Sequence, residues 1–163
     1  MNSDWYVLNV RDAPWRNGGP RGNFTKLVRD DDAQVGVNLF VLGPGEPMAM
    51  YHWEADQEDY LVLAGEALLI VNDEEHPLRR WDFFHCPPGI PHVLVGAGSG
   101  PATILALGAR IDSVKDEGWG GYPLSEVAAK HNASTEEETD KPEVAYARFE
   151  KSVPGEFREE WLP

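Results

Sequence analysis

The sequence has few cysteines and few basic residues for its length. Its 163 residues include one cysteine, Cys86, so no internal disulfide can form, and we expect a reducing compartment, the cytoplasm. Lys plus Arg number 14 against 28 Asp plus Glu, which gives a formal net charge of −14. A chain this acidic repels phosphate backbones and anionic lipid head groups. The composition therefore argues against nucleic acid or an anionic membrane as a partner.

Long apolar runs and a targeting segment are also missing. No stretch of about 18 apolar residues occurs, so we expect no membrane-spanning helix. The start, "MNSDWYVLNVRDAPWR", lacks a basic beginning followed by an apolar stretch and a small-residue cleavage site, so we expect no secretory signal. The length suits one domain with a sizeable core and is too short for two comfortable ones.

Turn-forming residues, in contrast, are abundant. The chain has 16 Gly and 13 Pro, and they separate short apolar stretches that alternate with polar residues, as is typical of strands joined by turns. No helical patterns of about ten to fifteen residues lie between these stretches, which disfavours a parallel α/β sheet. We therefore predict an all-β fold, an antiparallel barrel or sandwich. The expected strands cover residues 5–10, 24–30, 33–42, 59–71 with a bend at Gly65, 74–80, 82–87, 92–97 and 102–110.

The character of the chain changes after about residue 111. "YPLSEVAAKHNA" has apolar residues at helical spacing and Asn132 as a stop signal, which predicts a helix within 122–133. Ser134 with Glu137 and Asp140 with Glu143 have the spacing of helix capping boxes. The aromatic residues of this segment indicate that it packs against the rest of the protein; they are Tyr146, Phe149, Phe157 and Trp161. We expect N-terminal strands over 1–32, a barrel core over 33–111, and an acidic, partly helical extension over 112–163 packed on the barrel.

The stretch "YHWEADQED" places metal-ligand residue types on one side of an expected strand. Side chains at i and i+2 of a strand share a face, so His52 and Glu54 point the same way, and Glu58 is in phase with them if no bulge intervenes. One reading is one wall of a metal site. The other is an exposed acidic strand with a structural histidine, which this stretch alone leaves open.

A second stretch, "WDFFHCPPGIPH", favours the metal site. Pro87, Gly89 and His92 follow a P-x-G-x-x-H pattern directly before an apolar strand. The turn "PPGIP" reverses the chain, so His92 begins the returning strand and can face the first wall across the barrel.

Together the two stretches resemble the cupins, which are small double-stranded β-helix (jelly-roll) barrels. The resemblance covers about residues 33–110. Its first motif reads Gly45, His52, Glu54, Glu58, Gly65, and its second reads Trp81, Pro87, Gly89, His92, Gly96. Three positions depart from the family pattern. Glu54 replaces a histidine ligand, Trp81 replaces the glycine that opens the second motif, and Gly96 replaces its final asparagine.

The resemblance implies a divalent metal ion held by His52, Glu54, Glu58 and His92. Two carboxylates and two imidazoles balance a divalent charge, and this oxygen-rich set favours Mn, Fe or Zn. It also implies a homodimer and an enzyme acting on a small polar molecule, of the oxygenase, decarboxylase or sugar isomerase type. A non-catalytic ligand-binding or sensing module and a metal-free structural cupin remain the alternatives, because one fold hosts many functions.

Several other polar residues have two readings each. His85 either enters the barrel mouth or lines its wall without chemistry, and the second reading is preferred. For Cys86 a buried structural thiol is preferred to a ligand. Arg79, Arg80 and Arg110 either form an anion clamp for a carboxylate or phosphate or neutralise neighbouring acids, and we favour neutralisation.

Overall fold

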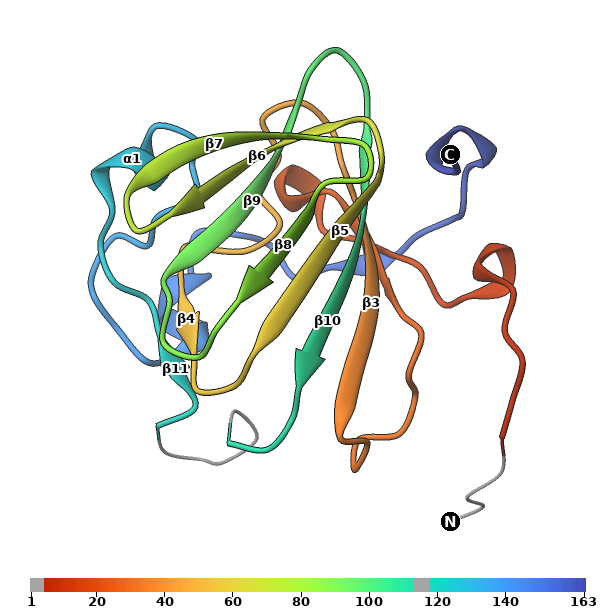
Figure 1. The fold of residues 1–163 in the computed structure, drawn as a ribbon, viewed down its shortest axis with the longest axis horizontal. Helices are drawn as coiled ribbons and strands as arrows, with labels where there is room; N and C mark the ends of the chain where they lie inside the picture. Colours follow the sequence, from red (N-terminus) through yellow and green to blue (C-terminus); the bar gives the residue numbers. More distant parts are fainter. Residues whose placement is uncertain (1–4, 113–117) are drawn as a thin grey trace.

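The chain folds into two packed antiparallel sheets, as the computed structural model in Figure 1 shows; the structure describes residues 5–112 and 118–163. The larger sheet has the order β12-β1-β2-β3-β10-β5-β8, and the smaller has the order β7-β6-β9. The strands of the larger sheet are β1 (Arg16–Asn17), β2 (Asn23–Lys26), β3 (Val35–Leu42), β5 (Glu58–Ala64), β8 (Phe83–Cys86), β10 (Ala102–Ala109) and β12 (Val153–Pro154). Those of the smaller sheet are β6 (Glu66–Val71), β7 (Glu74–Arg79) and β9 (His92–Ala97), and β4 (Trp53–Glu54) pairs separately with β11 (Gly120–Gly121). The all-β prediction is confirmed.

The predicted strands between residues 33 and 110 are present with small changes of boundary. The stretch 59–71 is two strands, β5 and β6, which belong to different sheets and meet at Gly65. Gly65 has φ +72°, and a Cβ at this position would lie 2.3 Å from the Pro101 carbonyl oxygen. Only glycine combines this backbone conformation with so close an approach. The predicted bend is therefore the corner at which the chain passes from one sheet to the other.

The predicted strand over 5–10 is wrong. Residues 5–9 have no regular structure, and a short 3-10 helix, η1 (Val10–Asp12), follows. Trp5 and Val7 are about nine-tenths exposed, so the alternating pattern here does not reflect a buried face. The predicted strand 24–30 is shorter than expected, because its pairing with β3 ends at Lys26.

Two tight turns carry non-glycine residues with positive φ. Asn72 (φ 49°) and Asp73 (φ 62°) form the two-residue turn between β6 and β7, a connection that favours Asn and Asp. Trp81 has φ +75° in the turn before β8, where the resemblance calls for glycine. Its backbone N–H donates to the Val62 carbonyl at 2.7 Å, and its side chain is 60% exposed. The turn thus keeps the left-handed conformation that glycine would provide, without glycine.

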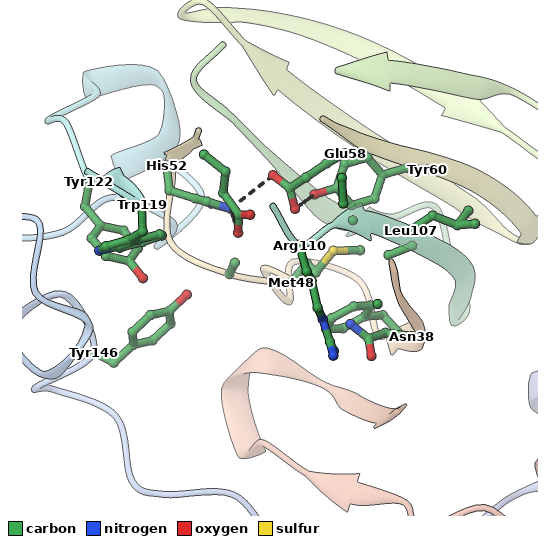
Figure 2. Close-up of a pocket in the computed structure, with 17 residues that line it drawn as sticks. Asn38, Met48, His52, Glu58, Tyr60, Leu107, Arg110, Trp119, Tyr122 and Tyr146 are labelled. Atoms are coloured by element: carbon green, nitrogen blue, oxygen red, sulfur yellow. Dashed lines mark hydrogen bonds and ion pairs between the residues drawn. The ribbon is translucent and has the colours of Figure 1, made fainter. Parts of the chain in front are cut away.

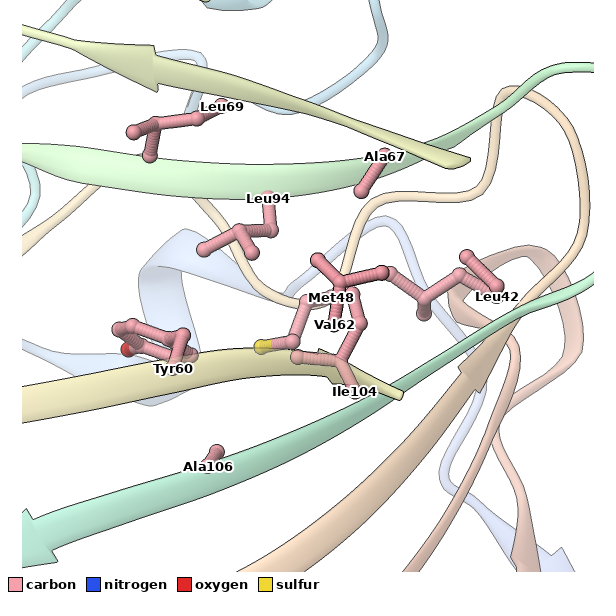
Figure 3. Packing of buried hydrophobic residues seen from close by; sticks show 10 residues of the cluster. Leu42, Met48, Tyr60, Val62, Ala67, Leu69, Leu94, Ile104 and Ala106 are labelled. Carbon is pink, nitrogen blue, oxygen red and sulfur yellow. The ribbon is translucent and has the colours of Figure 1, made fainter. Parts of the chain in front are cut away.

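The main core lies between the two sheets. Leu69 and Leu94 of the smaller sheet face Val62 and Ile104 of the larger one (Figure 3). Alternation along each strand directs every second side chain inward, and each large apolar side chain buried this way stabilises the fold by about 1.5–3 kcal/mol. The complete cluster is Leu42, Met48, Tyr60, Val62, Ala67, Leu69, Leu94, Ala102, Ile104 and Ala106.

The described part of the C-terminal extension contains two α-helices of one turn each, α1 (Glu126–Ala129) and α2 (Pro142–Ala145), and a short 3-10 helix, η3 (Glu159–Trp161). The helix predicted within 122–133 is thus much shorter. Its N-cap is Ser125, whose side chain accepts a hydrogen bond from the Ala128 N–H at 3.0 Å, and Asn132 (φ +55°) follows its end. No helix in the described part of the chain is long and apolar enough to cross a membrane.

Both predicted capping boxes are wrong. Ser134 accepts a hydrogen bond from the backbone N–H of Ser125 and begins no helix. Helix α2 has Lys141 as its N-cap, without a side-chain cap, and Pro142 as its first residue. Proline suits this position because its missing N–H has no partner in the first turn of a helix.

Aromatic residues of the extension pack on the barrel at two places. Trp119, Tyr122, Tyr146 and Phe149 cluster around buried Met50. Phe157 and Trp161 pack on Trp15, at ring-centroid distances of 6.1 and 5.0 Å. These contacts join the extension to the barrel and to the N-terminal segment that carries Trp15.

Candidate functional site

His52 and His92 lie opposite each other across a backbone bridge. The His52 N–H donates to the His92 carbonyl at 3.1 Å, and the His92 N–H donates to the His52 carbonyl at 2.8 Å. The two ring centroids are 5.0 Å apart, and both residues are buried. Main-chain pairing therefore brings together the histidines of the two sequence motifs.

Both rings are oriented by a carbonyl group two residues earlier in the chain. His52 Nδ1 lies 2.8 Å from the Met50 oxygen, and His92 Nδ1 lies 2.9 Å from the Ile90 oxygen. A carbonyl oxygen only accepts, so each Nδ1 carries the proton, and in the neutral ring each Nε2 has a free lone pair. Such a contact is what orients histidine ligands in metal sites.

Glu58 completes a compact group with the two histidines. Its Oε2 lies 3.3 Å from His92 Nε2 and 3.6 Å from His52 Nε2, and it is buried without a hydrogen-bond partner. One ligand atom from each of the three residues lies within 4.8 Å of the others. Burial by itself raises the pKa of Glu58, but hydrogen bonds from His52 and His92 and their positive charges, which act when these rings are protonated, outweigh burial and hold that pKa well below its usual range. A charged, unpartnered oxygen facing two imidazole nitrogens fits a bound cation.

Glu54 lies beside this group but is not part of it. Its Oε1 is 3.8 Å from His52 Nε2, and its side chain is 24% exposed, against 14% for Glu58. Burial, and then the charge of Glu58, raise the pKa of Glu54 to about 7. The structure thus brings together three of the four predicted ligands, and coordination by Glu54 stays a prediction.

Tyr60 is a site residue that the sequence reasoning missed. Its hydroxyl lies 2.8 Å from Glu58 Oε1 and 2.9 Å from His92 Nε2, and the residue is buried. Burial, and then the charge of Glu58, raise the pKa of this hydroxyl well above its ordinary value, so it keeps its proton. When His92 Nε2 holds a metal ion, the hydroxyl has Glu58 Oε1 as its acceptor. The signal was available, because Tyr60 follows Glu58 by two residues on one strand and shares its face.

The group opens into a cavity of about 360 Å³ between the barrel and the extension (Figure 2). Strands β3, β5 and β10 form one wall. Trp119, Tyr122 and Tyr146 of the extension form the other, and Tyr122 packs against the His52 ring at a centroid distance of 6.0 Å. The remaining lining residues are Gly36, Asn38, Phe40, Met48, Ala49, Glu54, Ala106, Leu107, Gly108, Ala109 and Arg110.

The other predicted polar residues divide by position. His85 does not line this cavity; its Nδ1 pairs with Asp59 at 2.7 Å, and its side chain is about half exposed. Cys86 is buried with its sulfur 3.3 Å from His92 Nδ1, and burial raises the pKa of this thiol to about 12, which fits the structural role preferred for it. Arg79 and Arg80 are exposed at the end of β7, whereas Arg110 lines the cavity.

A family model described as "Cupin domain" matches residues 38–108. Among solved structures, a cupin-superfamily sugar phosphate isomerase from Silicibacter pomeroyi is 26% identical to the chain, with a TM-score of 0.60; the match covers 66% of this chain and 77% of that one. A Cupin 2 conserved barrel domain protein from Salinispora arenicola is 18% identical (TM-score 0.54, 67% and 91% covered). A cupin 2 domain-containing protein from Halorhodospira halophila is 19% identical (TM-score 0.53, 68% and 75% covered). The last two likenesses concern the fold alone. No curated protein sequence matches the chain.

Proposed function

Because this chain belongs to the cupin superfamily and has its jelly-roll fold, we propose that the barrel holds a divalent metal ion and acts on a small polar molecule. His52, Glu58 and His92 are the proposed ligands, with Glu54 as the fourth. The observation that carries the proposal is Glu58 Oε2, which is buried, unpartnered and directed at two imidazole nitrogens. Desolvating a carboxylate oxygen without a partner costs free energy, and a bound cation removes that cost.

The proposed ligands favour a particular range of metals. Two carboxylates and two imidazoles make a ligand set without a soft sulfur atom. The sulfur of Cys86 is not part of this set, because it lies beside His92 Nδ1, on the side of the ring away from the proposed ligand atom Nε2. Such a set suits Mn, Fe or Zn. When bound, the metal would supply Lewis acidity, which polarises a carbonyl or hydroxyl oxygen of the substrate.

Of the three reaction types expected from the sequence, we favour sugar isomerisation. The Silicibacter pomeroyi protein with the likeness described above bears the name of a sugar phosphate isomerase. The cavity suits a small hydroxylated molecule, because carboxylates and the Asn38 amide meet polar groups while Trp119 and Tyr122 offer rings to carbon-bound hydrogens. Interconversion of an aldose and a ketose moves a proton between two adjacent carbons, which calls for a group in the cavity that takes the proton and returns it.

Glu54 has two proposed roles, as fourth ligand or as this proton carrier. The ligand role follows from the position of Glu54 in the first sequence motif. The proton-carrier role is favoured by geometry, because Glu54 lies outside the compact group and its side chain is more exposed to the cavity than that of Glu58. Glu54→Gln keeps the size of the side chain and removes its ability to carry a proton.

Turnover with and without metal tests the proposal. The protein as purified, the same protein after chelation, and Glu54→Gln are each incubated with a panel of aldose and ketose phosphates. We expect isomerisation that chelation abolishes and that one divalent metal restores. Loss of activity in Glu54→Gln with the metal retained assigns proton transfer to Glu54, and loss of the metal assigns it as a ligand. Stable sugar binding without conversion would contradict the enzyme and favour the binding-module alternative.

Three expectations from composition and resemblance remain proposals. They are a homodimer, a cytoplasmic location, and the absence of nucleic acid and membrane partners. Residues 5–9, the irregular N-terminal arm, include the exposed Trp5 and Val7. These two side chains suit the homodimer, since they offer apolar surface to a second chain.

A further inference from the structure

Arg110 is the one lysine or arginine side chain among the described residues that line the cavity. It directly follows β10, in a chain with twice as many acidic as basic residues. In the described part of the chain its guanidinium has one hydrogen-bond partner, the backbone oxygen of Asp30, 3.2 Å from Nη1. It pairs with no described carboxylate, so the preferred reading from the sequence, neutralisation of a neighbouring acid, does not describe this arginine.

The Arg110 guanidinium occupies space next to Gly36 that a larger side chain would fill. A Cβ on Gly36 would lie 3.0 Å from both Nε and Nη2 of Arg110, closer than such atoms ordinarily approach. The Asp30 carbonyl accepts a hydrogen bond from one of the five N–H groups of the guanidinium, and the other four have no hydrogen-bond partner among the described residues, so they remain for a ligand. An ordered guanidinium with free donors is the usual means by which proteins bind phosphate and carboxylate groups.

Asn38 adds a second polar group to the same part of the cavity. It lies two residues from Gly36 on β3, shares that face of the strand, and is close to Arg110 in Figure 2. Its Oδ1 is buried and has no hydrogen-bond partner. Buried amide groups are normally paired, so a partner from a bound molecule would satisfy it.

We propose that Arg110, positioned by Gly36 and Asp30, binds the anionic group of the molecule that enters the cavity, while Asn38 Oδ1 accepts a hydrogen bond from a neighbouring hydroxyl group of that molecule. The anionic group is an oxyanion, either phosphate or carboxylate. This proposal rests on the proposed function in that the reacting part of the same molecule lies at the His52, Glu58 and His92 group. With a net charge of −14 the chain as a whole repels anions, so the affinity for one must come from a local cation.

Binding of simple anions to the full chain tests this subsite. Inorganic phosphate and acetate are titrated by calorimetry into wild type, Arg110→Gln, Gly36→Ala and Arg79→Gln. Arg79→Gln is the matched control, because it removes the same charge from an exposed position outside the cavity. Gly36→Ala keeps Arg110 and its charge but displaces the guanidinium.

We expect Arg110→Gln to weaken binding of the preferred anion by about tenfold or more, and Gly36→Ala to weaken it by about threefold. Arg79→Gln should stay within about twofold of wild type. The two titrations distinguish a phosphate-binding subsite from a carboxylate-binding one. The anion of the matching class should bind more tightly to wild type, and its affinity should be the one that falls in Arg110→Gln and Gly36→Ala. Equal anion affinity in wild type and Arg110→Gln, or no binding of either anion by wild type, would overturn the subsite.

A metal-ligand variant separates this subsite from the proposed metal chemistry. In His92→Ala, anion binding that remains and is lost on adding Arg110→Gln supports a site that is independent of the metal. Binding that needs the metal and ignores Arg110 would overturn the proposal. If the protein neither holds metal nor isomerises sugars but binds phosphate through Arg110, the proposed function fails and the subsite stands.

Discussion

The two walls of the cavity differ in how the chain builds them. On the barrel wall, His52 and His92 meet through mutual backbone hydrogen bonds, and Glu58 lies on a strand paired on both sides. On the extension wall, Trp119 and Tyr122 flank the two-residue strand β11, and Tyr146 directly follows the one-turn helix α2. Apart from the backbone bridge between Tyr122 and Thr139, the positions of these side chains depend on packing around Met50. The first wall therefore fixes atoms for chemistry, whereas the second supplies shape. Substitutions in the two walls should consequently affect different properties.

The largest effect should come from opening the extension wall. Tyr122 is 5% exposed and packs on Trp119, Tyr146 and His52, so Tyr122→Ala leaves a cavity that lowers the free energy of unfolding by about 3 kcal/mol. Metal content should remain that of wild type, because the proposed ligands belong to the other wall. Chemical denaturation and elemental analysis measure the two quantities.

Tyr6→Ala is the control for this prediction, since Tyr6 is about half exposed on the N-terminal arm. This substitution should lower the free energy of unfolding by less than about 1 kcal/mol. If Tyr122→Ala lost its metal along with its stability, the two walls would not be separable.

Glu54 should make the metal-free barrel wall sensitive to pH. Its folded pKa of about 7 exceeds the ordinary value of 4.5, so the folded state binds more protons than the unfolded state between these values. Stability contributed by the protonated group is present below about pH 4.5 and is lost as pH rises through 7. The free-energy difference that corresponds to this pKa shift must be discounted, because Glu54 is partly exposed. Metal-free Glu54→Gln should therefore be more stable than wild type by about 2 kcal/mol at pH 8, and the difference should shrink by pH 5.

Denaturation of the chelated proteins at both pH values checks this prediction. Glu74→Gln is the control, because Glu74 is exposed on β7 and belongs to no buried group. A stability difference between wild type and Glu54→Gln that does not change with pH would show that Glu54 is not a destabilising buried acid.

Tyr60→Phe should weaken metal binding without removing a ligand. The variant loses the hydroxyl that donates to Glu58 Oε1 at 2.8 Å and keeps the ring in the core. Loss of a group that orients a metal ligand typically lowers metal affinity by about tenfold or more. Competition with a fluorescent chelator gives the affinity, and Tyr122→Phe, which removes a hydroxyl from the extension wall, is the matched control. Equal affinity in wild type and Tyr60→Phe would contradict the positioning role.

The smallest effect should come from the turn before β8, the strand that pairs with β5 next to Glu58. Trp81 holds φ +75° and is 60% exposed. A non-glycine residue costs about 1 kcal/mol in this conformation, so Trp81→Gly should raise the free energy of unfolding by about 0.5–1 kcal/mol. Trp5→Gly, in the irregular exposed arm, should change it little. A destabilised Trp81→Gly would mean that the indole ring contributes more than the backbone conformation costs.

The sequence allowed more of the barrel wall to be predicted than of the extension wall, for physical reasons. Strand alternation is local, so β3, β9 and β10 lie close to their expected ranges. The extension has helices of four residues, which are too short to be stable alone and form only through tertiary contacts. Capping spacing without that context misplaced both of the predicted N-caps, Ser134 and Asp140.

Within the site, strand phase does not explain why Glu54 and Glu58 line the same cavity. Residues 55–57 are irregular, so Glu54 and Glu58 belong to two separate strands, β4 and β5. They reach one cavity because the chain turns between them, and β11 of the extension pairs with β4. That pairing joins residues more than 60 positions apart, and no local pattern indicates it.

The central claim is that Glu58 and the two histidines hold a divalent metal ion. Elemental analysis of the protein purified without added metal, beside Glu58→Gln and the exposed control Glu74→Gln, tests this claim most directly. We predict about one divalent ion per chain in wild type and Glu74→Gln, and less than about a tenth of that in Glu58→Gln. Equally little metal in all three proteins, or full occupancy in Glu58→Gln, would contradict it.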